Sequence, residues 1–223
     1  MVYNAFHIAS RNNENIRCFA KFFPDFCARP CKLTLSRESK FSPTNSEVMS
    51  RKKKFPSESL VSMTELVLPN DTNTLNNLMG GRLMHWMDIV SAISAQKHSN
   101  RIVVTASVDN ISFKHPIQLG NVVTLKAKVT RAFSSSMEVR IDVEAEDVPS
   151  SKKIESNSAY FTFVAMDDQG NPTEVPIVEP ETEEEKALFE SALRRRQLRL
   201  ILAGRMKPSE ANELKSLFDI KGA

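Results

Sequence analysis

The sequence is poor in cysteine and contains no long apolar run. Its three cysteines, Cys18, Cys27 and Cys31, all lie near the N-terminus, and none follows Cys31. A disulfide framework is therefore not expected, and a reducing compartment such as the cytoplasm is the default. The sequence has no apolar stretch of about 18 residues or more, so a membrane-spanning helix is not expected either.

Two signatures of hydrolase chemistry are also missing. The sequence has no G-x-S-x-G motif, which would place a nucleophilic serine at a sharp turn. The four histidines, His7, His85, His98 and His115, are too scattered for a metal site. The sequence therefore predicts neither a covalent serine mechanism nor a metal or other cofactor.

Acidic residues are scarce in the N-terminal segment. Residues 1–54 contain 11 Lys and Arg but only 4 Asp and Glu, whereas the rest of the chain contains 19 and 23. The net charge of +3 thus originates in this leader and says little about partners of the main domain. Three interpretations of the leader stay open: a disordered, dispensable or partner-binding basic arm, an organelle transit peptide, or sequence upstream of a later start at Met49 or Met63.

One strand, one long helix and four further strands are predicted after the leader. Residues 59–69 read as a strand, residues 70–77 as a polar loop, and Gly80 to about Ser99 as a helix. The four later strands are expected within residues 101–113, 121–133, 137–147 and 156–168. Apolar residues alternate with polar ones in two of them, at Val123, Leu125, Ala127, Val129 and at Val139, Ile141, Val143, Ala145. This alternation is typical of antiparallel strands with one covered and one exposed face.

The C-terminal part is predicted to be helical. Three prolines space the chain after Gly170, and a helix is then expected from Glu183 to near Gly204. Thr182 and Glu185 form a capping box at its start. A second, short helix is expected over residues 209–218. The predicted organisation is therefore a basic leader (1–54), one α+β domain (55–171), and a proline-spaced linker with C-terminal helices (172–223).

One carboxylate, Asp88, lies in the apolar part of the first predicted helix, within NNLMGGRLMHWMD. Burying an unpaired carboxylate is costly. Gly81, His85, Asp88 and Ala92 share a small or polar helix face that could border a cleft. The Gly-Gly pair leaves N–H groups unobstructed at a helix N-terminus, which attracts negative charge. The arrangement suits ester or thioester hydrolysis by an activated water. The alternative is that the glycines serve close packing and that Asp88 only bonds a neighbour.

Several longer strings occur in order along the chain. They are LPNDTNTLNNLMGGRLMHWMD, IVVTASVDNISFKHPIQLGNVV, SAYFTFVAMDDQGNPTEVP and PETEEEKALFE. Together they resemble the acyl-CoA thioesterases of the hotdog superfamily, in particular the branch that includes brain cytosolic acyl-CoA hydrolase and its bacterial relatives. The match runs from about Ser59 to Arg196. It implies a single α+β hotdog domain, in which an antiparallel sheet wraps around a long central helix, with C-terminal helices added.

The resemblance also implies a function and a site. The family hydrolyses fatty acyl-CoA to free fatty acid and CoA, using an Asn before the Gly-Gly pair and an Asp on the helix. These residues align with Asn77 and Asp88 of this chain. Asp88 would orient or deprotonate water, while Asn77 and the backbone N–H of Gly81 or Arg82 would polarise the thioester carbonyl. Because the two residues act across an interface in the family, a homodimer or a trimer of dimers is implied.

Other side chains are candidates for contacts with CoA. Arg101, Lys114 and Arg131 lie near strand ends and could bind its phosphates, although a solvated surface position is the alternative for each. The run Arg194–Arg196 is expected to form a solvated helix face, or else to bind a phosphate. Thr72 and Asn73 are expected to shape the loop before the helix, and His85 is either a structural or an assisting residue.

Two rival functions are compatible with the same domain. A non-catalytic acyl-CoA-binding sensor should lack the Asn and Asp pair, which is present here. An acyl-thioester dehydratase needs a catalytic His beside a paired carboxylate, and the segment around His115 lacks that context. No nucleic-acid partner is predicted. The expected location is the cytoplasm, or an organelle such as the mitochondrion if the leader is a transit peptide.

Overall fold

The computed structural model describes residues 51–109, 111 and 115–216, with only the backbone of residues 154–156. Most of the predicted leader, Lys114 and the last seven residues lie outside this range. Arg51, the first described residue, is bound to the folded domain. Arg51 donates hydrogen bonds to the carbonyl oxygens of Phe133 and Val175. Residues 51–54, which the prediction counts with the leader, thus belong to the described fold.

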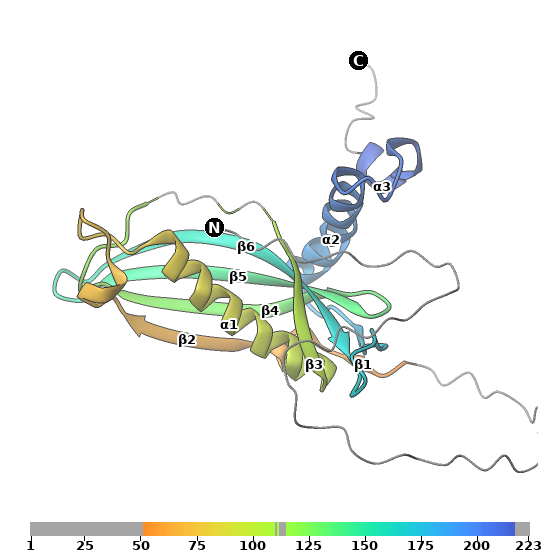
Figure 1. Cartoon of the computed structure of the whole chain (residues 1–223), viewed down its shortest axis with the longest axis horizontal. Coiled ribbons are helices and arrows are strands. Elements are labelled where there is room, and N and C mark those ends of the chain that lie inside the picture. Colours follow the sequence, from red (N-terminus) through yellow and green to blue (C-terminus); the bar gives the residue numbers. More distant parts are fainter. Residues whose placement is uncertain (1–50, 110, 112–114, 217–223) are drawn as a thin grey trace, which may run out of the picture. The chain divides into compact units, whose positions relative to one another are not determined.

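A five-stranded antiparallel sheet forms the body of the fold (Figure 1). Its strands are β2 (Val61–Leu66), β3 (Ile102–Val108), β4 (Val122–Ala132), β5 (Ser136–Asp147) and β6 (Lys152–Met166). The order across the sheet is β2-β4-β5-β6-β3, so β2 and β3 are its outer strands. All five predicted strands are confirmed. β6 begins earlier than predicted, because the turn after β5 is tight and places Ser151 at a φ of 56°.

Helix α1 (Gly80–Ser99) lies across this sheet and agrees with the prediction (Figure 1). It ends where Asn100 adopts the left-handed conformation, with a φ of 52°. The predicted inward faces of β4 and β5 are buried, and they form one core with Leu83, Met87 and Val90 of α1. The alternation of apolar residues therefore identified the covered face of the sheet correctly.

One side of α1 stays exposed in the single chain. Met84, Ile89 and Ile93 are 40%, 37% and 42% exposed, respectively. The sequence predicted apolar burial on several sides of this helix, and the described chain covers only the side that faces the sheet. Ile89 and Ile93, which are one turn apart, and Met84 on the other edge of this side are therefore available to a further molecule.

The second long helix, α2 (Glu183–Leu202), packs on the opposite face of the sheet. Its predicted capping box is present, since Thr182 accepts the N–H of Glu185 and Glu185 accepts that of Thr182. Lys128 on β4 forms an ion pair of 3.5 Å with Glu185. The following helix, α3 (Asn212–Lys215), is shorter than expected and follows η3 (Pro208–Glu210).

The arginine run of α2 is not a solvated face, contrary to the first of its two interpretations. Arg195 forms an ion pair of 2.7 Å with Glu138 of β5 and lies 3.7 Å from the ring centroid of Tyr160. Arg196 lies 4.2 Å from the ring centroid of Phe133. Burial lowers the pKa of Arg196, and the neighbouring Arg199 lowers it further. These arginines attach α2 to the outer face of the sheet.

The remaining short elements lie next to the ends of the longer strands. β1 (Lys53–Lys54) and β7 (Ile177–Val178) form a parallel pair, while η1 (Pro56–Ser59) and η2 (Pro69–Asp71) flank β2. Among the described residues, no helix is long and apolar enough to cross a membrane.

Candidate active site

Asp88 is half-buried on the third turn of α1, where it faces strand β3. The hydroxyl of Thr105 donates a hydrogen bond of 2.8 Å to Asp88 Oδ1. Thr105 stands at a β-bulge, because the pairing of β3 with β6 shifts between Thr105 and Ser107. A bulge changes the direction of the side chains beside it. The local irregularity of β3 thus accounts for the contact that orients Asp88.

The helix face predicted to border a cleft is open in the single chain. Gly81 and His85 are exposed, and Asp88 and Ala92 are half-buried. A carboxylate in this setting has one oxygen held by a neutral hydroxyl and remains accessible to water. That combination suits a group that accepts a proton from a bound water.

Two backbone N–H groups at the start of α1, those of Gly81 and Arg82, are the expected donors to the thioester carbonyl, and their surroundings differ. The N–H of Arg82 donates to the carbonyl oxygen of Met79 at 3.0 Å, so it is already bonded. A Cβ placed on Gly81 would meet no atom within 4 Å, so packing within the described chain does not require glycine there. The missing side chain instead leaves open space beside the Gly81 N–H. Gly81 is therefore the better candidate to receive a carbonyl oxygen.

A closed turn precedes the helix and carries three asparagines. Thr72 and Leu78 form an antiparallel bridge at its base. Inside it, Asn73 Oδ1 accepts the N–H of Leu75 at 2.9 Å and that of Asn77 at 3.2 Å. Because both partners are N–H donors, the carbonyl side of the Asn73 amide must face the turn. Its NH₂ group, the donor, therefore points the other way.

Asn77 builds this turn with its backbone. Its carbonyl oxygen accepts the N–H of Asn73 at 2.8 Å, and it forms an isolated bridge with Gln118. The catalytic role of Asn77 stays a prediction. Asn73, which the sequence reasoning treated as a loop-shaping residue, is a second candidate because its donor group is directed outward from an exposed position.

The predicted CoA-binding residues are not gathered in one place. Arg101 is exposed at the start of β3, beyond the end of α1 and about 16 Å of helix away from Asp88 at 1.5 Å per residue. Arg131 instead contacts α2: it donates to the carbonyl oxygen of Phe189 at 2.8 Å and lies 4.1 Å from that ring. Burial lowers the pKa of Arg131. Lys114 lies outside the described residues.

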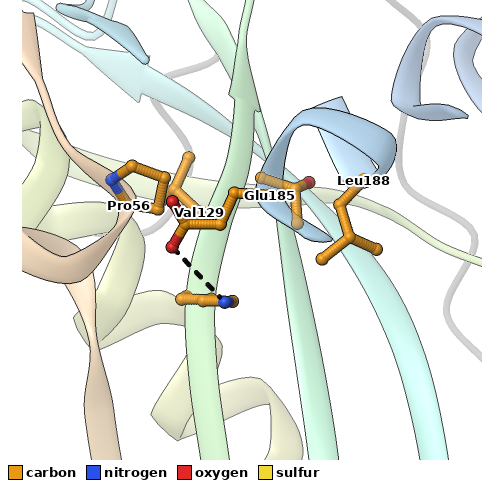
Figure 2. A pocket seen from close by; sticks show the side chains of 6 residues that line it. Pro56, Val129, Glu185 and Leu188 are labelled. Atoms are coloured by element: carbon orange, nitrogen blue, oxygen red, sulfur yellow. Dashed lines mark ion pairs between the residues drawn. The ribbon is translucent and has the colours of Figure 1, made fainter. Parts of the chain in front are cut away.

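A hollow on the α2 side of the sheet is separate from these residues (Figure 2). It is lined by Pro56, Lys128, Val129, Thr130, Glu185 and Leu188. Its empty volume, open solvent included, is about 160 Å³. Asp88 is not among its lining residues, so this hollow is not the candidate active site.

A sheet that curls around one long helix is the arrangement of the hotdog fold, and Asp88 lies on that helix. Residues 75–151 match the model of the thioesterase superfamily. An uncharacterized acyl-CoA thioester hydrolase of Bacillus subtilis is 42% identical over 142 residues, which cover 64% of this chain and 83% of that protein. The chain belongs to the thioesterase superfamily and, within it, to the acyl-CoA thioester hydrolases.

Three further comparisons agree with this assignment. Mouse acyl-coenzyme A thioesterase 11 is 40% identical over 200 residues, 90% of this chain, but the chain spans only 32% of that protein. A hexameric acyl-CoA thioesterase superposes with a TM-score of 0.66 at 38% identity, covering 68% of this chain and 97% of the other. The acyl-CoA hydrolase of Staphylococcus aureus, solved with butyryl coenzyme A and coenzyme A, gives 0.64 at 39% identity, covering 69% and 95%.

Alanine variants of the Staphylococcus aureus enzyme provide a spacing to compare. They replace one asparagine, one aspartate and one threonine; the asparagine precedes the aspartate by 15 residues and the threonine follows it by 17. In this chain Asn73 precedes Asp88 by 15 residues and Thr105 follows it by 17. Asn77 precedes Asp88 by only 11. The spacing therefore favours Asn73 over Asn77 as the counterpart of that asparagine.

Proposed function

We propose that the chain hydrolyses fatty acyl-CoA to a free fatty acid and CoA, with Asp88 as the residue that activates water. The observation that carries the proposal is the Asp88 carboxylate, half-buried on α1 and held by Thr105 at 2.8 Å. The match of the asparagine, aspartate and threonine spacing to an acyl-CoA hydrolase supports it.

The proposed reaction has two steps. Asp88 accepts a proton as the water oxygen bonds to the thioester carbon, and the carbonyl oxygen becomes negatively charged near the Gly81 N–H. The positive end of the α1 dipole stabilises that charge. The intermediate then collapses, the C–S bond breaks, and the proton passes from Asp88 to the departing CoA sulfur.

An asparagine amide would assist from the turn before α1. Its NH₂ group would donate to the carbonyl oxygen or hold the attacking water. The resemblance to the family implied this role for Asn77, whereas the turn geometry and the spacing support Asn73. Both asparagines are therefore replaced in the experiment that tests the proposal.

We further propose that the site is completed by a second copy of the chain. The exposed side of α1, with Ile89 and Ile93 on one edge and Met84 on the other, offers apolar contacts to it. β3 is an outer strand of the described sheet, and an outer strand presents backbone groups that can pair with another chain. The hexameric relative supports assembly of this kind, either as a homodimer or as a trimer of dimers.

The remaining proposed substrate contacts are those with the CoA phosphates. Arg101 and Lys114 stay candidates for the CoA phosphates. Arg131 is less suited, because its guanidinium is bound to α2. The cytoplasmic location, with an organelle as the alternative, stays a prediction.

The test measures free CoA released from acyl-CoAs of several chain lengths by the wild type and by Asn73→Ala, Asn77→Ala and Asp88→Asn. We expect Asp88→Asn and one asparagine variant to be inactive, and a mixture of the two inactive proteins to regain part of the activity. Full activity of Asp88→Asn would contradict the proposal. Binding of CoA by a wild type that releases none would favour the sensor alternative instead.

A further inference from the structure

A second carboxylate, Asp71, is buried just before the turn that carries Asn73. It is only 4% exposed. Its Oδ2 accepts the N–H of Leu68 at 3.1 Å, and its Oδ1 accepts Nε of Arg82 at 2.7 Å. A buried carboxylate is costly unless charged or polar donors compensate it. The contact with Arg82, on the first turn of α1, is therefore the natural anchor of Asp71.

Asp71 is also the point at which the turn joins the helix. Its carbonyl oxygen accepts the N–H of Met79, the N-cap of α1, at 2.8 Å. The bridge between Thr72 and Leu78 closes the turn directly above this bond. The direction of the Asn73 amide relative to α1 thus depends on how Asp71 is held against the helix.

We propose that the ion pair between Asp71 and Arg82 is a positioning device for the Asn73 amide. The proposal rests on the proposed function, and neither residue of the pair touches the substrate in it. An Nε–carboxylate contact is directional as well as charged, so it fixes an orientation that an ammonium group would not. The arginine is itself restrained, because its guanidinium lies 5.6 Å from the ring centroid of the buried Trp86.

A purely structural role for this ion pair predicts different behaviour. Loss of a structural contact lowers the melting temperature and leaves the kinetics of the folded enzyme unchanged. Loss of positioning lowers kcat in fully folded enzyme, because a misplacement of about 1 Å can cost on the order of a hundredfold in rate. KM changes little in that case, since the ion pair does not contact CoA.

The first experiment compares the kinetics of Arg82→Met, Arg82→Lys, Asp71→Asn and the double variant. We expect kcat to fall about tenfold in Arg82→Met, with KM within about twofold, and Arg82→Lys to recover only part of it. The double variant should be no worse than the more impaired single variant. Lys126→Met, which breaks an exposed ion pair of 3.2 Å with Glu144, is the matched control and should keep wild-type kcat. Wild-type kcat in folded Arg82→Met would overturn the proposal.

The second experiment places Arg82→Met in one copy of a mixed oligomer. One copy carries Asp88→Asn and supplies the intact turn, and the other carries Asn73→Ala and supplies Asp88. We expect Arg82→Met to reduce activity about tenfold in the copy that supplies the turn, and several-fold less in the other. Equal losses from both placements contradict a positioning role. If the mixture without Arg82→Met regains no activity, the composite site fails, and the kinetics of the single variants still decide the role of the ion pair.

Discussion

Glu138 and Asp88 are carboxylates on opposite sides of one sheet, and they are held in different ways. Glu138, on the face that α2 covers, is 0% exposed. It pairs with Arg195 at 2.7 Å and with Arg199 at 3.3 Å, and it accepts the hydroxyl of Thr130 at 2.9 Å. Asp88 is half-buried, and among the described residues its hydrogen-bond donor is the neutral hydroxyl of Thr105.

The difference separates a structural carboxylate from a reactive one. Around Glu138, both oxygens are occupied by charged donors and water is excluded, so the group can only hold α2 in place. Around Asp88, one oxygen is oriented and the other remains accessible. An enzyme that uses water as its nucleophile needs the second arrangement, because the carboxylate must reach both the water and its proton.

The largest expected effect comes from a substitution of Asp88, the reactive carboxylate. Asp88→Asn keeps the shape of the side chain and its bond to Thr105, but the amide cannot accept the proton of water. We expect the rate of CoA release to fall by about a thousandfold, within the range typical of a lost general base. The melting temperature should change little, which circular dichroism would check. A stable variant with more than a tenth of wild-type activity would argue against Asp88 as the base.

The second effect concerns stability and Glu138, the structural carboxylate. Glu138→Gln leaves Arg195 without its buried counter-charge, whereas Arg199 keeps its ion pair with Asp109, so we expect the free energy of unfolding to fall by about 3 kcal/mol. The activity of the folded fraction should stay within about twofold of wild type, because Glu138 lies on the face of the sheet opposite Asp88. Denaturation in urea measures the loss. The matched control, Glu144→Gln, breaks an exposed pair and should cost less than about 1 kcal/mol.

Much of the fold could be predicted because local patterns determine it. The strict alternation from Val139 to Ala145 identified the covered face of β5, and the Gly-Gly pair and Ser99 marked the limits of α1. The role of Arg195 could not be predicted in this way. A run of arginines on a helix looks the same whether it faces solvent or a buried Glu138 on a strand 57 residues earlier.

The candidate site was predictable in part for the same reason. Asp88 is conspicuous as a charge in an apolar helix. Thr105 gives no such signal, since its contact depends on a bulge that no residue type in β3 announces. Three asparagines lie between positions 73 and 77, and only the hydrogen bonds of the folded turn show which amide directs its donor outward.

The third effect tests how the reactive carboxylate is held. Thr105→Val removes the hydroxyl that donates to Asp88 and keeps the β-branched shape. Hydrogen bonds to charged groups contribute about 1.5–3 kcal/mol, so we expect kcat to fall at least about tenfold. Thr105→Ser retains the donor and should recover most of the activity. If valine and serine behave alike, the contribution of Thr105 is packing and not orientation of Asp88.

The smallest expected effect concerns His98, a titratable residue near the C-terminal end of α1. His98 is 0% exposed; its Nε2–H donates to the carbonyl oxygen of Pro176 at 2.9 Å, and Nδ1 has no hydrogen-bonding partner among the described residues. Burial lowers the pKa of His98, and the bond to Pro176 only partly opposes this.

Because the folded state keeps His98 neutral, the unfolded chain binds the extra proton first as the pH falls. The stability that His98 contributes is therefore present above its ordinary pKa of about 6.5 and is lost as the pH falls below it. Between pH 7.5 and 5.5 we expect the wild type to lose about 1 kcal/mol more than His98→Gln, which keeps a donor for Pro176 and cannot titrate. Urea midpoints at the two pH values measure this difference. An identical pH dependence in the wild type and in His98→Gln would show that His98 does not titrate with unfolding.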